Sequence, residues 1–126
     1  MAGNYLQEGR VLDFTNSSGS TITSGSPVAI GAIIGVALAD IANGEVGAVQ
    51  IDGVFQLPKV SGAVIAQGES LTFDVSANSG AGAFDDNQAT PATGDITGAA
   101  AVAAEAAGSG TTTIAVRLTG VPGTVA

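Results

Sequence analysis

The chain has 126 residues, three Lys and Arg against eleven Asp and Glu, a net charge of -8, and no His, Cys or Trp. The absence of Cys and His excludes disulfides and every site that needs a thiol or imidazole nucleophile, base or metal ligand. Three cations neutralise too few phosphates to bind nucleic acid or anionic lipid, so we expect neither a nucleic acid nor a membrane as partner.

The composition predicts an all-β fold, either a small β-barrel or a sandwich. The chain has 13 Val, 9 Ile and 12 Thr, but only 4 Glu and 1 Lys, and its 19 Gly interrupt the β-branched runs at short intervals. Residues 1–9 are expected to form an extended N-terminal arm. Strands are expected at residues 10–15, 27–30, 33–39, 45–51, 54–57, 70–75 and 111–118. The run at 33–39 is almost continuously apolar, which is typical of a strand buried on both faces.

Residues 98–107, GAAAVAAEAA, fit two interpretations. Helix propensity favours a helix. The segment is short for an unsupported helix, however, and it has no stripe of large apolar side chains. We expect a strand, because an internal similarity pairs this segment with an earlier strand.

That similarity relates residues 24–51 to residues 67–118. Gly25 aligns with Gly68 and residues 28–30 align with 71–73, whereas Gly35 aligns with Gly98. The change of offset places an insertion at residues 77–94. Either the chain contains a true duplication, or it contains two similar hairpins punctuated by glycine. The insertion is rich in turn formers, so we expect an exposed mobile loop, the alternative being a contact loop anchored by Phe84.

No group of residues in the sequence predicts catalysis, a metal site or a cofactor. Asp85-Asp86-Asn87 offers oxygen ligands but lacks the spacing of a calcium loop. The glycines at 31 and 35 lack the Lys and Ser or Thr of a phosphate-binding loop. The serines at 17–20 have no base to activate them. The chain is therefore not expected to be an enzyme.

Only 11% of the residues are charged, against about 25% in an ordinary soluble domain. Burial of an uncharged surface in an assembly explains this composition, and the alternative is a monomer kept soluble by its net charge. The first residues do not form a signal peptide, and the apolar stretch at 27–39 is too short to span a bilayer. We therefore expect a soluble protein made in the cytoplasm. Arg10, Lys59 and Arg117 either pair locally with Glu8, Asp13 or Glu105, or contact an acidic neighbouring subunit.

Several motifs in order resemble the capsid cement, or head decoration, proteins of tailed bacteriophages. They are NYLQEG at 4–9 with LDF at 12–14, SGSPV at 24–28, IGVA at 34–37, GVFQLPK at 53–59 and AVRL at 115–118. The resemblance covers about residues 3–118, and the chain departs from it in the segment 77–94 and in the tail 119–126. It implies a β-rich protein on the outer surface of the virion head, with the major capsid protein and further copies of itself, as a dimer or trimer, as partners.

On this reading the arm is residues 1–9, a single β domain spans 10–118, and 119–126 form a C-terminal tail. The candidate contacts to the capsid or to other subunits are Tyr5, Leu6, Arg10, Val54, Phe55, Leu57, Lys59 and Phe84. The alternative function is a surface-binding module, for instance for carbohydrate. Such sites usually stack aromatic side chains on the ligand, and the chain has one Tyr and no Trp.

Overall fold

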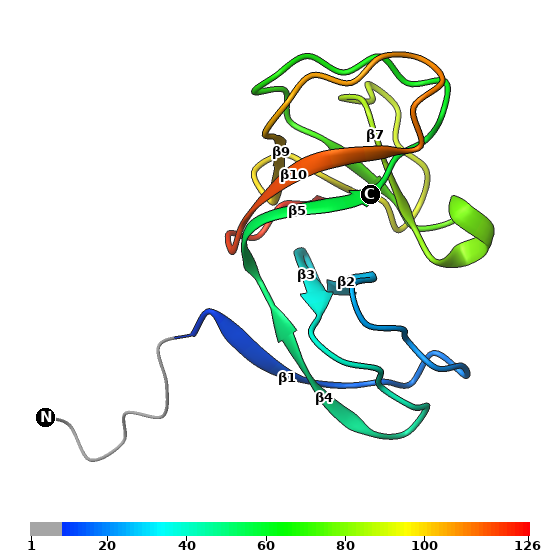
Figure 1. Cartoon of the computed structure of the whole chain (residues 1–126), viewed down its shortest axis with the longest axis vertical. Coiled ribbons are helices and arrows are strands. Elements are labelled where there is room, and N and C mark those ends of the chain that lie inside the picture. The colour runs from blue at the N-terminus through cyan, green and yellow to red at the C-terminus, as the bar shows by residue number, and fades with distance from the viewer. Residues whose placement is uncertain (1–8) are drawn as a thin grey trace, which may run out of the picture.

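A computed structural model describes residues 9–126 and arranges them in two β lobes (Figure 1). The N-terminal lobe is one antiparallel sheet with the strand order β1-β4-β3-β2. Its strands are β1 (Val11–Thr15), β2 (Pro27–Ile30), β3 (Ile33–Ala37) and β4 (Val46–Gln50). Its core consists of Val28, Ala37, Ile41, Val49 and Ile51. Gly31, with φ +59°, forms the tight turn of the β2–β3 hairpin, where a side chain would be strained.

The C-terminal lobe contains two sheets, with strand orders β5-β10-β9 and β11-β8-β6-β7. The first has β5 (Asp52–Pro58), β9 (Ala101–Ala103) and β10 (Thr113–Thr119), and the second has β6 (Thr72–Asp74), β7 (Ala83–Asp85), β8 (Ile96–Thr97) and β11 (Thr124–Val125). A single 3-10 turn, η1 (Asn78–Gly80), precedes β7. The bridges Ser70–Val102 and Lys59–Phe84 join the two sheets, so that β5, β10, β9, β6 and β7 form a closed ring around the larger core.

Strand β3 connects the two lobes. Its residues Ile34 and Val36 belong to the larger core, whereas Ala37 belongs to the smaller one. Residues 34–37 are all buried, as expected of a strand covered on both faces, but the strand ends at Ala37, and Leu38 and Ala39 of the expected range 33–39 are exposed. The lobes therefore share packing through the strand that the sequence shows as the longest apolar run.

The two lobes repeat one backbone pattern. The N–H of Gly25 donates to the carbonyl of Ala37 at 2.8 Å, and the N–H of Gly68 donates to the carbonyl of Ala103 at 2.8 Å. The same correspondence extends to the strands, with β1 equivalent to β5, β2 to the segment 70–73, β3 to β9 and β4 to β10. The pairing Thr15↔Val46 in one lobe accordingly returns as Pro58↔Thr113 in the other.

The bridges outside the strands show the same equivalence. Ile22 and Ile41 exchange two backbone hydrogen bonds of 2.9 and 2.8 Å, and Ile65 and Ala107 exchange two of 2.8 and 2.9 Å. The fold thus contains the same unit twice, as the sequence similarity indicated. The alignment of its second half is corrected, because the pairs Pro27↔Val36 and Ser70↔Val102 make Gly35 equivalent to Ala101 rather than to Gly98.

Each of the seven strands expected from the sequence is present, within a few residues at its ends. Residues 98–107 contain strand β9 and no helix, which confirms the strand interpretation. The expectation of an exposed loop at 77–94 is wrong for residues 82–84, which are buried where β7 begins, whereas residues 78–81 and 87–90 are exposed. The segment folds against the lobe because Phe84 is fully buried and packs against Phe73, with ring centroids 5.0 Å apart. The sequence also missed β8 and the C-terminal strand β11.

Candidate interaction surfaces

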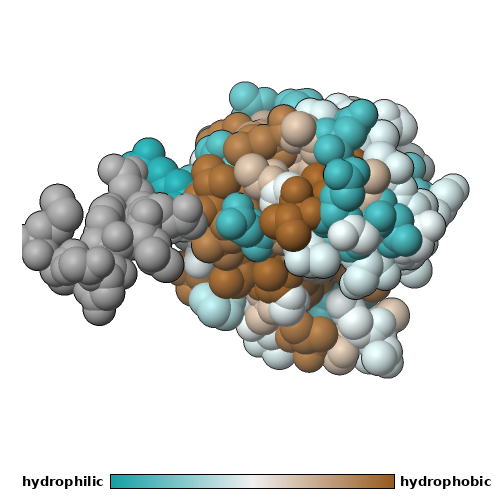
Figure 2. Space-filling model, turned by 90° about the horizontal axis from the view of Figure 1, so that it is seen from below, coloured by the Kyte–Doolittle hydropathy of each residue, from teal (hydrophilic) through white to brown (hydrophobic). Residues whose placement is uncertain are grey.

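The part of the chain from residue 9 onward contains no group of three or more side chains able to hold a metal ion. No helix in that part is long and apolar enough to cross a membrane. What the structure offers instead are surfaces. Seen from the N-terminal lobe, apolar residues gather in the middle and on the left of the view, whereas hydrophilic and intermediate residues cover much of the right side (Figure 2).

Four candidate contact residues lie on strand β5 or directly after it, and they differ in how far they are exposed to solvent. The side chain of Val54 is 58% exposed and that of Phe55 is partly buried, whereas that of Leu57 is buried, with only 1% exposed. Lys59, directly after the strand, is also buried, with only 4% of it exposed. Side chains of a strand alternate between its faces, so the outer face of this sheet presents Val54 beside its cross-strand neighbour, the exposed Arg117.

Lys59 acts as a structural anchor inside the protein. Its Nζ donates hydrogen bonds to the carbonyls of Val60 at 2.9 Å, Ser61 at 3.3 Å and Thr111 at 3.3 Å. Three carbonyl acceptors compensate the ammonium for the loss of water. Asn16 holds the equivalent position in the N-terminal lobe, where its buried amide donates to the carbonyls of Ser20 and Ile41.

Arg10 forms an exposed ion pair at 3.7 Å with Asp52, which is not one of the partners expected from the sequence, Glu8, Asp13 or Glu105. An exposed pair of this kind contributes little to stability, about 0–1 kcal/mol, so Arg10 stays available at the surface. Tyr5 and Leu6 lie outside the described residues. Burial thus restricts the candidate contacts after residue 8 to Arg10, Val54 and the partly buried Phe55, while Leu57, Lys59 and Phe84 support the fold.

The acidic side chains of the insertion have local roles. Burial, and secondarily the neighbouring charges of Asp86 and Asp74, raise the pKa of Asp85, although the N–H of Asp86 partly opposes this by donating to the carboxylate at 2.8 Å. Glu69 behaves in the opposite way. The N–H groups of Asn87 and Ala66 donate to its carboxylate and lower its pKa. Glu69 therefore ties the insertion to the loop before β6.

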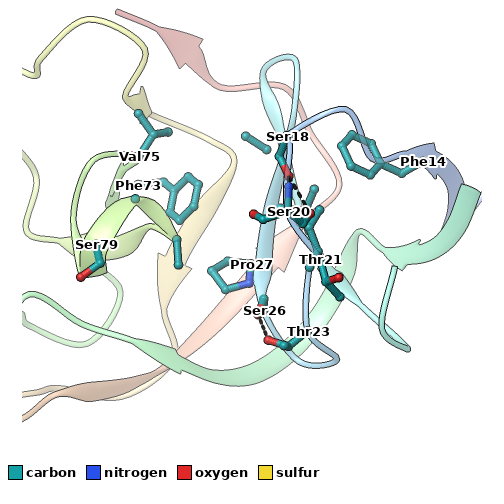
Figure 3. Close-up of a pocket in the computed structure, with 15 residues that line it drawn as sticks. Phe14, Ser18, Ser20, Thr21, Thr23, Ser26, Pro27, Phe73, Val75 and Ser79 are labelled. Atoms are coloured by element: carbon teal, nitrogen blue, oxygen red, sulfur yellow. Dashed lines mark hydrogen bonds between the residues drawn. The ribbon is translucent and has the colours of Figure 1, made fainter. Parts of the chain in front are cut away.

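A cleft of about 460 Å³ lies between the two lobes. One wall is β2 and the loop before it, and the opposite wall carries Phe73, Val75 and Ser79 (Figure 3). The lining from the N-terminal lobe consists of Phe14, Ser18, Ser20, Thr21, Ile22, Thr23, Ser26, Pro27, Val28 and Ala29. None of the cleft-lining residues in the described part of the chain is charged. The cleft was not predicted from the sequence, although the insertion that occurs in only one of the two similar units was a signal for it.

The described residues thus form an all-β protein whose candidate sites are exposed sheet faces and an uncharged cleft. Residues 6–118 match the family of phage cement proteins, and the chain belongs to that family. No curated protein matches the chain. Family membership gives the protein a structural role in the bacteriophage virion, in association with the capsid.

Proposed function

We propose that the protein, made in the host cytoplasm, binds the outer surface of the assembled head as a homo-oligomer and holds adjacent major capsid subunits together. The observation that carries this proposal is the outer face of the sheet β5-β10-β9. Val54 is 58% exposed there, and its neighbours Gln56, on the same strand, and Arg117, on β10, are also exposed. A face of largely uncharged side chains has a small desolvation cost when a partner covers it.

Cementing follows from linkage. A protein that binds the closed shell more tightly than the separated subunits shifts the equilibrium toward the closed shell, and many copies act on one particle. An oligomer adds avidity, because its second contact forms at a high effective concentration. The sparse charge and the small side chains of this chain suit such repeated, flat contacts.

The test compares undecorated heads with and without the purified protein. We expect decorated heads to release their DNA at a higher temperature and after a stronger osmotic shock. Val54→Asp should weaken binding to heads, because it buries a carboxylate without a partner. Val64→Asp is the matched control, since Val64 is also an exposed valine, at 66%, and lies in the loop before β6. Equal release points with and without protein would refute the proposal, and equal binding of the two variants would move the contact away from this sheet.

A further inference from the structure

The N-terminal lobe lacks a strand that closes the C-terminal lobe. In the C-terminal lobe, β7 lies between β6 and the end of β5, antiparallel to β6 and parallel to Lys59 at its bridge with Phe84. In the N-terminal lobe, β2 pairs only with β3 among residues 9–126. The position equivalent to that of β7, between β2 and Ser17, holds no strand of the described chain.

Backbone groups at this position point toward the vacancy. In the C-terminal lobe, the N–H of Val60 donates to the carbonyl of Phe84 in β7 at 2.9 Å. The equivalent residue in the N-terminal lobe is Ser17, which is exposed where β7 would cover it. On the other side, the N–H of Ala37 donates to the carbonyl of Ser26 at 3.0 Å, so Ser26 faces β3. Hydrogen-bonding direction alternates along an antiparallel strand, so Ala29 directs its N–H and C=O away from β3, into the open edge.

The side chains around the vacancy are correspondingly less covered. In the C-terminal lobe, Phe84 belongs to the larger core. Three other residues of that core are almost fully buried: Leu57 is 1% exposed, Ile65 2% and Phe73 3%. Their equivalents in the N-terminal lobe are only partly buried: Phe14, Ile22 and Ile30. Phe14 and Ile22 both line the cleft. The cleft therefore exposes the apolar groups that a counterpart of Phe84 would cover.

We propose that this vacancy receives residues 2–8 of a second copy as an added β-strand, with Tyr5 or Leu6 in the place that Phe84 takes in the other lobe. Strand addition to an open sheet edge is an established mode of peptide recognition. This strand exchange would be the contact that forms the oligomer of the proposed function. It rests on the proposed function only for the role of that oligomer on the capsid.

Chemistry and direction both favour this occupant. The cleft is lined by apolar and hydroxyl side chains without charge, and residues 3–7, GNYLQ, are uncharged and carry two large apolar groups. The connection to β1 disfavours the same copy's segment at this edge. A segment that ran parallel to β1 beside Asn16 would then have to return to Val11, about 17 Å away at about 3.3 Å per residue, and the return would use about five of the residues before Val11. A second copy has no such connection.

The experiment measures the mass of the full-length protein by light scattering. We expect an oligomer for the wild type, and monomers for Tyr5→Ala/Leu6→Ala and for Ala29→Pro. Proline removes the N–H that faces the vacancy but leaves the bonds between β2 and β3 intact. Ala29→Thr is the matched control and should remain oligomeric, because Thr72 holds the equivalent position beside β7. A peptide of residues 2–9 in excess should dissociate the wild type, and Ala29→Pro should weaken the binding of that peptide by about tenfold.

A monomeric wild-type protein overturns the proposal, as does an oligomer that neither the variants nor the peptide affect. If the wild type is monomeric and Ala29→Pro instead reduces binding to heads, the occupant is a capsid segment and not a second copy. If Ala29→Pro fails to fold, Tyr5→Ala/Leu6→Ala still decides the matter, since those residues precede the folded lobes. A wild-type oligomer that does not bind heads would contradict the proposed function but not the strand exchange.

Discussion

Truncation of Phe84 to alanine tests whether the insertion is part of the core. Phe84 is 0% exposed, packs against Phe73 and bridges to Lys59. A buried phenylalanine covers about 150–250 Å², worth about 4–6 kcal/mol at about 25 cal/mol per Å². Buried Phe→Ala replacements cost about 3–5 kcal/mol, so we expect about 4 kcal/mol here.

Chemical denaturation followed by circular dichroism measures this loss, and calorimetry should show a Tm lower by about 10–20 °C. Phe84→Leu retains most of the apolar volume and should cost about 1 kcal/mol, mainly through the lost aromatic pair. Val54→Ala, on the exposed face of β5, should lie within about 0.5 kcal/mol of the wild type. A loss below about 1 kcal/mol for Phe84→Ala would show that the insertion does not pack as described.

Three further variants test local features of the fold. Asp85→Asn should stabilise the protein at pH 7, because burial raises the pKa of this carboxyl above the ordinary value of 3.8 and penalises its charged form. The gain should vanish in acid below that value, where the carboxyl is protonated in both the folded and the unfolded protein. Gly82→Ala should destabilise far more than Gly80→Ala in a thermal melt, since both glycines have φ near +90° but only the Cβ added at Gly82 meets an aromatic ring. Lys59→Met should cost about 2–4 kcal/mol in denaturant unfolding, because it leaves three carbonyls without their donor, and a cost near zero would contradict the anchoring role.

Local sequence patterns were sufficient to predict most of the strands. Runs of β-branched residues bounded by glycine turns specify strand and turn through nearest-neighbour sterics, which require no tertiary contact. For the same reason the hairpin Pro27–Ile30 to Ile33–Ala37 was predicted almost to the residue. The strand β9 needed the internal similarity, because alanine propensity alone favours a helix there.

The candidate contacts were less predictable, because burial depends on partners far away in the chain. A lone lysine after a proline suggests a surface cation, but Lys59 is satisfied by the carbonyl of Thr111, 52 residues later. A loop rich in turn formers suggests exposure, but Phe84 is held by Phe73 on another strand. Such non-local pairings leave no signal in the local pattern.

The sequence by itself determined the class of the protein. The absence of Cys and His excluded thiol and imidazole chemistry, the β-branched composition set an all-β fold, and an ordered set of motifs indicated the family, because each of these depends only on which residues are present and in what order. The tertiary structure alone decided that the insertion supplies β7 to one lobe and that the other lobe has no counterpart among the described residues. The physical reason is that strand pairing and burial are long-range, so an open edge becomes visible only when both copies of the unit are folded and compared.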